Sequence, residues 1–202
     1  MKTTLILLAA GASARMRGAD KLLQEVGGMA CVKAMALRGL AGGMQVIVTL
    51  PARDHPRAVA LAETPVLRLP VPDADQGMAH SLRAAITALP EGTEAAMILP
   101  ADMPGLEIDD LRAVIDEART HPEALIVQAA TEDGTPGHPV LFRAALFPEI
   151  EALTGESGAR PVIQRHAEHR RMVKRPGRRA RLDLDTPEEW AAWRAGQAAR
   201  RD

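Results

Sequence analysis

A run of small residues followed by two cations is the part of the chain whose residue types most directly suggest chemistry. An aliphatic stretch, 5–8, leads into the small residues 9–14, and Arg15 and Lys21 follow. Small side chains let backbone N–H groups approach a ligand closely, and successive N–H groups form a concave site for anions. Arginine adds a forked donor and lysine a compact positive charge. The pattern predicts a phosphate-binding loop after a buried strand.

Neither of the common phosphate-binding motifs accounts for this loop. A Walker A loop has four residues between its glycines and ends in Gly-Lys-Ser/Thr. Here six residues separate Gly11 from Gly18, and Leu22 follows Lys21. The dinucleotide fingerprint G-x-G-x-x-G also fails, because alanine and serine follow Gly11. The segment is therefore a phosphate site of another type or a simple strand-to-helix turn with surface cations.

Asp102 follows the apolar run 95–100. If the strands of the predicted sheet are parallel, this residue lies at the same sheet edge as the loop. A nucleoside triphosphate enters with Mg²⁺, a hard cation that takes a few carboxylates together with phosphate oxygens and water. Asp102 is thus a candidate metal ligand, and the alternative is a turn aspartate before Pro104.

A second acidic segment lies near the C-terminal end of the sequence. Asp183 and Asp185 alternate with two leucines, which predicts a short strand with both carboxylates on one face. The next residues, 186–189, read Thr-Pro-Glu-Glu. They offer a capping threonine, a proline in the first turn and a glutamate three residues after the cap. We therefore expect the aspartates directly before a C-terminal helix.

These segments resemble the nucleotidyltransferases with a MobA-like NTP transferase domain, whose loop reads L-A-A/G-G-x-x-x-R-M…K. The likeness runs from about residue 4 to about residue 193. Within the family, the chain is similar to the molybdenum cofactor cytidylyltransferase (MocA-like) branch, which has alanine where the guanylyltransferase branch has glycine. The matching residues and segments are Leu8, Ala9, Ala10, Gly11, Arg15, Met16, Lys21, LPADMP (99–104), PGHPVLF (136–142) and DLDTPEEW (183–190).

The resemblance implies a role for each residue. Arg15 and Lys21 would be catalytic by holding the triphosphate, and Asp102 and Asp185 would bind Mg²⁺, with Asp183 supporting the metal site or merely solvated. Ala10 in place of glycine would narrow the base pocket and favour a pyrimidine. The residues expected to contact the nucleotide are Leu8, Ala9, Ala10, Gly11, Gly77 and Ser81. Ser81 could equally cap a helix.

Three residues are expected on the acceptor side. His138 lies in the segment that the resemblance places near the acceptor pocket. The segment 154–166 resembles a family motif written G-D-x-G-A-R, in which Glu156 replaces the usual aspartate and Arg160 is the arginine. The longer carboxylate could shift acceptor specificity. The basic run 165–181 is either a solvated face or a rim for a phosphorylated pterin or a recipient molybdoenzyme.

The implied reaction is transfer of CMP from CTP to the molybdopterin-type molybdenum cofactor, with release of pyrophosphate. A phosphate acceptor is already anionic, so this chemistry needs positioning and charge stabilisation and no general base. A guanylyltransferase, a transferase for another phosphorylated acceptor and a non-catalytic escort of the cofactor are the alternatives. The presence of Arg15, Lys21, Asp102 and Asp185 favours an enzyme over the escort.

Composition excludes several other classes of protein. The 202 residues carry a formal net charge of −1 and only two phenylalanines, two tryptophans and no tyrosine, which disfavours nucleic-acid binding. No apolar segment reaches the length of a membrane span. The first strand is followed by no cleavage region, so we expect a cytoplasmic protein. The single cysteine, Cys31, allows no internal disulfide and is expected to be buried.

Strand-like and helix-like segments alternate along the chain, which predicts an α/β fold with a mostly parallel sheet. The resemblance makes this a three-layer, Rossmann-like sandwich. Because there is no repeat, low-complexity tract or linker, we expect one nucleotidyltransferase domain over 1–202. The expected strands are 5–8, 44–51, 65–72, 95–100, 124–130 and a returning strand within 134–142, and the expected helices are 29–41, 54–63, the later part of 73–89, and 109–119.

Overall fold

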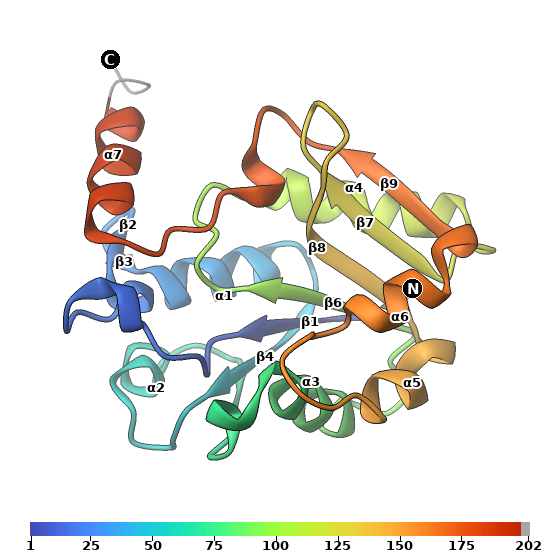
Figure 1. Cartoon of the computed structure of the whole chain (residues 1–202), viewed down its shortest axis with the longest axis horizontal. Coiled ribbons are helices and arrows are strands. Elements are labelled where there is room, and N and C mark those ends of the chain that lie inside the picture. The colour runs from blue at the N-terminus through green and yellow to red at the C-terminus, as the bar shows by residue number, and fades with distance from the viewer. Residues whose placement is uncertain (199–202) are drawn as a thin grey trace.

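A seven-stranded sheet with helices on both faces forms the frame of the computed structural model, which describes residues 1–198 (Figure 1). The strand order is β5-β4-β1-β6-β8-β7-β9. Every neighbouring pair is parallel except those made by β8, which runs antiparallel to β6 and β7. The strands are β1 (Thr3–Leu8), β4 (Gln45–Leu50), β5 (Leu67–Pro70), β6 (Ala95–Pro100), β7 (Ile126–Ala130), β8 (Pro136–Arg143) and β9 (Arg170–Lys174).

The helices form two layers, one on each face of the sheet, and a buried hydrophobic cluster fills each interface between helices and sheet. Leu5 and Leu7 of β1 pack with the helices of one layer, α1, α4 and α7, whereas Ile6 packs with α3, α5 and α6. The longer helices are α1 (Cys31–Ala41), α3 (Met78–Thr87), α4 (Ile108–Thr120) and α7 (Pro187–Ala198). The shorter elements are α2 (Pro56–Ala60), α5 (Phe147–Glu151), α6 (Arg160–Arg165) and a small hairpin of β2 (Glu25–Val26) and β3 (Met29–Ala30). The predicted three-layer sandwich is confirmed.

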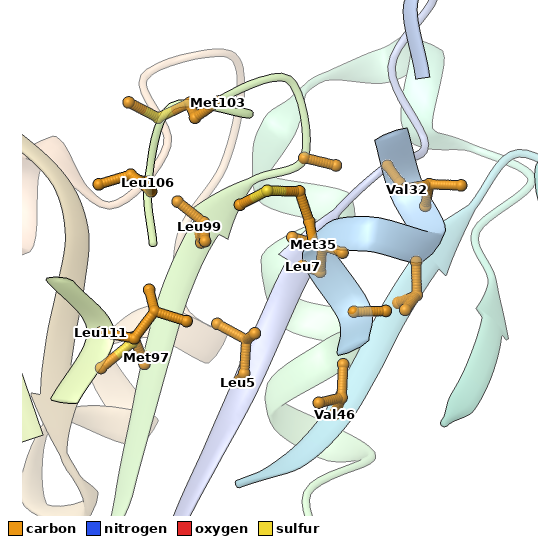
Figure 2. Close-up of a cluster of buried hydrophobic side chains, with 14 of the residues drawn as sticks. Leu5, Leu7, Val32, Met35, Val46, Met97, Leu99, Met103, Leu106 and Leu111 are labelled. Carbon is orange, nitrogen blue, oxygen red and sulfur yellow. The ribbon is translucent and has the colours of Figure 1, made fainter. Parts of the chain in front are cut away.

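Burial on both faces explains why β1 is an uninterrupted aliphatic run. A strand covered by helices on each side needs apolar residues at every position. Figure 2 shows Leu5 and Leu7 beside Met35 of α1 and Met97 of β6, within the larger cluster. Each such side chain contributes about 1.5–3 kcal/mol when it leaves water. Cys31 belongs to this cluster, so its predicted burial is confirmed.

The segment with the alternating aspartates does not form the predicted strand. Residues 182–185 lie in neither helix nor strand, although Leu184 is buried and Asp183 exposed as the alternation requires. The backbone N–H of Leu184 donates to the carbonyl of Asp102 (3.0 Å), which is a single bond to a loop and no ladder. The alternation holds for Asp183 and Leu184, but the side chain of Asp185 is only 12% exposed, so the two aspartates do not share one exposed face. A strand also needs a partner strand.

The basic run contains structure that the sequence pattern did not reveal. Its middle part forms β9, which pairs with β7 at the edge of the sheet. Charged side chains on an edge strand discourage pairing with another chain. The predicted helix at 54–63 is shorter in the structure, and the hairpin of β2 and β3 was not predicted. No helix within residues 1–198 is long and apolar enough to cross a bilayer.

The chain after β9 is anchored before it reaches Asp185. Asp110, a fully buried residue of α4, accepts hydrogen bonds from Arg175 Nε (2.8 Å) and Arg179 Nη1 (3.4 Å). Gly137 of β8 lies so close to the same segment that a Cβ would stand 2.0 Å from the carbonyl oxygen of Ala180. These contacts join the C-terminal segment to α4 and to β8. The one-domain prediction for 1–202 stays a prediction, and 199–202 lie outside the described residues.

We expect Gly137→Ala to destabilise the protein by about 1–3 kcal/mol, because the added methyl group would displace a backbone carbonyl. Chemical denaturation of the variant and the parent protein measures this difference. Gly196→Ala is the control, since Gly196 lies in α7 with open space around it, and alanine favours a helix. Equal stability of Gly137→Ala and the parent protein would show that the segment near Ala180 is not held tightly.

Candidate active site

Lys21 lies between the two predicted metal ligands. Its Nζ donates to Asp102 and to Oδ1 of Asp185 (2.6 Å), which are 81 and 164 residues away in the sequence. Arg15 approaches the other oxygen of Asp185 through Nη2 (2.5 Å). The side chains of Lys21, Asp102 and Asp185 are 16%, 12% and 12% exposed, whereas that of Arg15 is 71% exposed. Lys21 is therefore the inner cation of the site and Arg15 the outer one.

The ends of two neighbouring parallel strands bring these groups together. Leu8 at the end of β1 stands opposite Pro100 at the end of β6. The backbone N–H of Ala101 donates to the carbonyl of Leu8 (3.1 Å), and Leu184 N–H donates to the carbonyl of Asp102 (3.0 Å). The loop after β1, the loop after β6 and the C-terminal segment are thus joined by backbone hydrogen bonds at the carboxyl edge of the sheet.

The predicted capping box at the start of α7 is confirmed, and it orients Asp185. Thr186 Oγ1 accepts a hydrogen bond from the N–H of Glu189 (3.2 Å). Glu189 Oε2 accepts hydrogen bonds from the N–H groups of Asp185 (2.8 Å) and Thr186 (2.9 Å). These two backbone donors hold the pKa of Glu189 below its ordinary value. The backbone at Asp185 is therefore fixed by the helix that follows it.

The two carboxylates keep Lys21 protonated. Burial alone would lower the pKa of Lys21, but the charges and hydrogen bonds of Asp102 and Asp185 outweigh it and raise the pKa above the ordinary 10.5. Lys21 therefore acts as a permanent cation and cannot serve as a base near neutral pH. Two carboxylates and two cations, Arg15 and Lys21, leave the cluster without net charge.

Asp102 has an oxygen available for a further ligand. Its Oδ1 is buried and has no hydrogen-bond partner among the described residues. A buried carboxylate oxygen normally has a partner, so this oxygen is free to accept a water, a cation or a ligand donor. Within residues 1–198, no group of three or more acidic, histidine or cysteine side chains could hold a metal by itself. Magnesium often needs only one or two carboxylates plus substrate phosphates, and Asp102 and Asp185 fit that requirement.

A cavity of about 230 Å³ lies beside Lys21 and Asp102. Gly11 lines this cavity, and a Cβ added to Gly11 would meet no atom within 4 Å. The space beside Gly11 is therefore open. The cavity is lined by Leu8, Ala9, Ala10, Gly11, Ala12, Lys21, Leu22, Ala74, Met78, Ser81, Pro100, Asp102 and Glu156. Five of the six predicted nucleotide contacts thus share one cavity with predicted catalytic, metal and acceptor residues.

The sixth predicted nucleotide contact, Gly77, has a different position. It is not among the lining residues and precedes α3 with φ 133°. A Cβ there would stand 2.6 Å from the carbonyl oxygen of Gly155, which also accepts a hydrogen bond from Ala79 N–H (3.1 Å). Ser81 lies within α3 and caps nothing, so the capping alternative is wrong. The loop at Gly77, which is predicted to contact the nucleotide, therefore packs directly on the loop at Gly155, which precedes the predicted acceptor residue Glu156.

The three predicted acceptor residues are separated in the structure. Glu156 lines the cavity, whereas His138 and Arg160 do not. Burial lowers the pKa of His138, and the Asp102 and Asp183 carboxylates oppose this shift. Ile98 of β6 stands opposite Val140 of the antiparallel β8, so His138 lies towards the end of β6 that the Asp102 loop follows. Arg160 is exposed at the start of α6. The structure thus associates Glu156, and less directly His138, with the cluster that contains Lys21 and Asp102.

Four of the eight lysine and arginine residues of the basic run 165–181 are paired with neighbouring carboxylates. Arg165 pairs with Glu149 and Arg171 with Glu117, in addition to the two arginines on Asp110. These ion pairs connect the run to α4 and α5, which favours a structural role for its paired arginines over a role as an anion-binding rim. Its cations without an acidic partner, within the part of the chain that the structure describes, are Arg170, Lys174, Arg178 and Arg181.

A family model described as the MobA-like NTP transferase domain matches residues 5–170. The chain belongs to this family. The matched range contains the loop, Lys21 and Asp102, whereas Asp185 lies beyond it. The resemblance deduced from the motifs is therefore confirmed at the level of the family.

Several relatives of this NTP transferase share much of its sequence or fold. Purine catabolism protein PucB of Bacillus subtilis (strain 168) is 32% identical over 120 residues, which cover 58% of this chain and 56% of that protein. Bifunctional protein GlmU of Rhodococcus opacus (strain B4) is 29% identical over 79% of this chain but 34% of its own length. The chain thus spans about half and about one third of these two relatives.

A solved structure covers nearly the whole NTP transferase chain. Rv0371c of Mycobacterium tuberculosis H37Rv is 26% identical, with a TM-score of 0.81 over 95% of this chain and 97% of that one. A second structure of Rv0371c is a complex with manganese, at 25% identity and a TM-score of 0.77 over the same shares of the two chains. The three-layer fold is therefore shared along the full length of this relative.

One buried residue of the transferase site was not predicted from the sequence. Arg57 of α2 is 2% exposed and contacts the loop after β1 through its guanidinium. No motif marks it, because the segment around it reads as a short helix with a surface arginine. Its only signal in the sequence is its place shortly after the second long strand, whose carboxyl end lies at the same edge as the loop.

We expect Lys21→Met to lower the free energy of unfolding by about 1–3 kcal/mol at neutral pH, because two part-buried carboxylates lose their charged partner. The raised pKa of Lys21 means that its stabilisation is fully present below pH 10.5 and is lost as the pH rises through the folded-state pKa. Denaturant titrations at a series of pH values should therefore show the difference from the parent protein shrinking above pH 10.5.

Lys174→Met is the matched control for this measurement, since Lys174 is exposed and makes no ion pair within residues 1–198. A difference between Lys21→Met and the parent protein that stayed constant across the whole pH range would contradict the expected electrostatic origin.

Proposed function

We propose that this protein transfers CMP from CTP to the phosphate of a molybdopterin-type molybdenum cofactor and releases pyrophosphate. The observation that carries the proposal is the junction of Lys21, Asp102 and Asp185 beside a cavity lined by the small-residue loop. Membership of the NTP transferase family supports the nucleotide substrate. Consumption of CTP would also be consistent with the expected cytoplasmic location.

In the proposed reaction, an oxygen of the acceptor phosphate attacks the α-phosphorus of CTP. The new P–O bond forms as the bond between the α-phosphorus and the bridging oxygen to the β-phosphate breaks, and pyrophosphate carries away the electron pair. Lys21 would hold the triphosphate from inside the site, and the exposed Arg15 would neutralise the β- and γ-phosphates at its rim. Because Lys21 stays protonated, it stabilises charge and moves no proton.

Asp102 and Asp185 would hold Mg²⁺. When bound, this cation supplies positive charge to the phosphate oxygens. The side chains of Arg15, Lys21, Asp102 and Asp185 sum to no net charge, so a triphosphate needs such an added cation to bind well. The unpaired oxygen of Asp102 supports this assignment, as does the manganese bound by the relative Rv0371c.

The choice of cytosine rests on Ala10. Ala10 is among the residues that line the cavity, and it is buried. Glycine at this position would widen the pocket and admit a purine more readily. The similarity of the loop to the cytidylyltransferase branch supports the same choice, and GTP is the natural competitor to test.

The acceptor is assigned from the cavity and the family resemblance. Glu156 lines the nucleotide cavity, and the loop that carries it packs on Gly77, so an acceptor bound there would reach the α-phosphate. His138 and Arg160 complete the proposed acceptor side. A recipient molybdoenzyme would then take the dinucleotide product. The relative PucB is named for purine catabolism, but its name identifies no acceptor.

Pyrophosphate release in the presence of Mg²⁺, molybdenum cofactor and one of CTP, GTP, ATP or UTP tests the proposal. We expect release with CTP, and we expect Ala10→Gly to increase the use of GTP about tenfold or more, as removal of one methyl group from a pocket wall allows. Release with GTP in the parent protein would place it in the guanylyltransferase branch. Cofactor binding without release from any nucleotide would favour the escort.

Asp185→Asn and Asp183→Asn form a matched pair for the metal site. Asp185 contacts both Arg15 and Lys21, whereas Asp183 is exposed and makes no ion pair in the described chain. We expect the first variant to lower the rate of pyrophosphate release about 100-fold or more, the usual scale for a lost electrostatic stabiliser, and the second to change it little. Equal losses would contradict the assignment of Asp185.

A further inference from the structure

We propose that Arg57 and Asp20 are positioning residues, which hold the loop 9–13 in the conformation that receives the phosphates of the nucleotide. This inference rests on the proposed nucleotide binding and names the residues that prepare its site. Neither residue belongs to the motifs that identified the loop. Both act through the backbone of the loop and through Ser13.

The guanidinium of Arg57 donates four hydrogen bonds, three to the loop 9–13 and one to Asp20. Nη1 donates to the carbonyl oxygens of Ala9 (2.6 Å) and Gly11 (2.8 Å). Nε donates to Oδ2 of Asp20 (2.7 Å), and Nη2 donates to Oγ of Ser13 (3.1 Å). Four of the five N–H donors of an arginine are thereby used. Arg57 is buried and occupied, so it acts on a phosphate only through the loop.

The two carbonyl contacts determine where the neighbouring N–H groups point. In a trans peptide, the C=O and N–H bonds are opposed, and the peptide bonds of this loop are trans. With the Ala9 and Gly11 carbonyls turned to Arg57, the N–H groups of Ala10 and Ala12 point away from it. Neither N–H donates to an acceptor within residues 1–198. The loop thus presents free donors, as an anion site requires.

Asp20 extends the same network to Lys21. Its Oδ1 accepts hydrogen bonds from Leu22 N–H (2.9 Å) and Ser13 Oγ (3.1 Å). Ser13 Oγ in turn accepts a hydrogen bond from the backbone N–H of Lys21 (3.2 Å). Burial works against the Asp20 carboxylate, but the contacts with Arg57 and these donors lower its pKa overall. The ion pair of Arg57 and Asp20 therefore fixes the position of the loop 9–13 and also the backbone at Lys21, the inner cation.

A purely stabilising role explains this arrangement less well. A buried ion pair gains little over apolar residues of the same size, because both charges must leave water. The directed contacts with two carbonyls and one hydroxyl instead impose a particular backbone conformation. Lysine is a poor replacement, since a point charge cannot reproduce the forked geometry of the guanidinium.

The test compares Arg57→Lys and Asp20→Asn with the parent protein and with Arg53→Lys, a control at an exposed arginine of the preceding turn. CTP and CMP affinities in the presence of Mg²⁺ are measured by calorimetry, together with amide hydrogen exchange over residues 9–13. We expect both variants to bind CTP about tenfold or more weakly, with a smaller loss for CMP, and the loop amides to exchange faster. Arg53→Lys should behave as the parent protein does.

Unchanged CTP affinity and loop exchange in both variants would overturn the inference. A lowered melting temperature with unchanged affinity of the folded protein would also overturn it, since that is the result of a merely structural role. If Arg57→Lys does not fold, the inference is tested with Asp20→Asn alone, because asparagine keeps the shape of the aspartate side chain. If the parent protein binds no nucleoside triphosphate, the proposed function fails by itself, and loop exchange still tests the role of Arg57.

Discussion

The attraction of one ammonium group for two carboxylates joins the distant parts of this protein at its candidate active site. Lys21 comes from the loop after β1, Asp102 from the loop after β6, and Asp185 from the segment before α7. Removing one of these part-buried charges would weaken the placement of the others, because an unpaired buried charge is costly. The geometry of the fold therefore has to bring three separate segments to within a hydrogen-bond length.

Backbone hydrogen bonds carry out much of this positioning. Ala101 is tied to Leu8 and Leu184 to Asp102, while Glu189 holds the N–H of Asp185. On the other side of the site, Arg57 draws loop carbonyls towards itself. The charged side chains thus extend from a backbone that is already fixed, which limits the reorganisation needed when a polyanionic ligand binds.

Close glycine contacts couple the proposed nucleotide and acceptor sides. Gly77 packs on the carbonyl of Gly155, and a Cβ on Gly158 would stand 2.7 Å from the sulfur of Met78, which lines the cavity. The loop that carries Glu156 is therefore set by its contact with the start of α3. A change in either loop would be transmitted to the other through direct packing, as close-packed interiors do not absorb displacement.

Local pattern in the sequence determined the buried strand β1, the small-residue loop with its cations, the aspartate after β6 and the capping box at Thr186. These features depend on neighbours a few residues apart, so periodicity and residue type reveal them. Only the tertiary structure decided that Lys21 contacts both Asp102 and Asp185, that 182–185 form no strand, that Ser81 lies inside a helix and that Arg57 is buried beneath the loop. Such outcomes depend on which residues the packing brings together from distant parts of the chain. The spacing of residues along the sequence does not determine these long-range contacts.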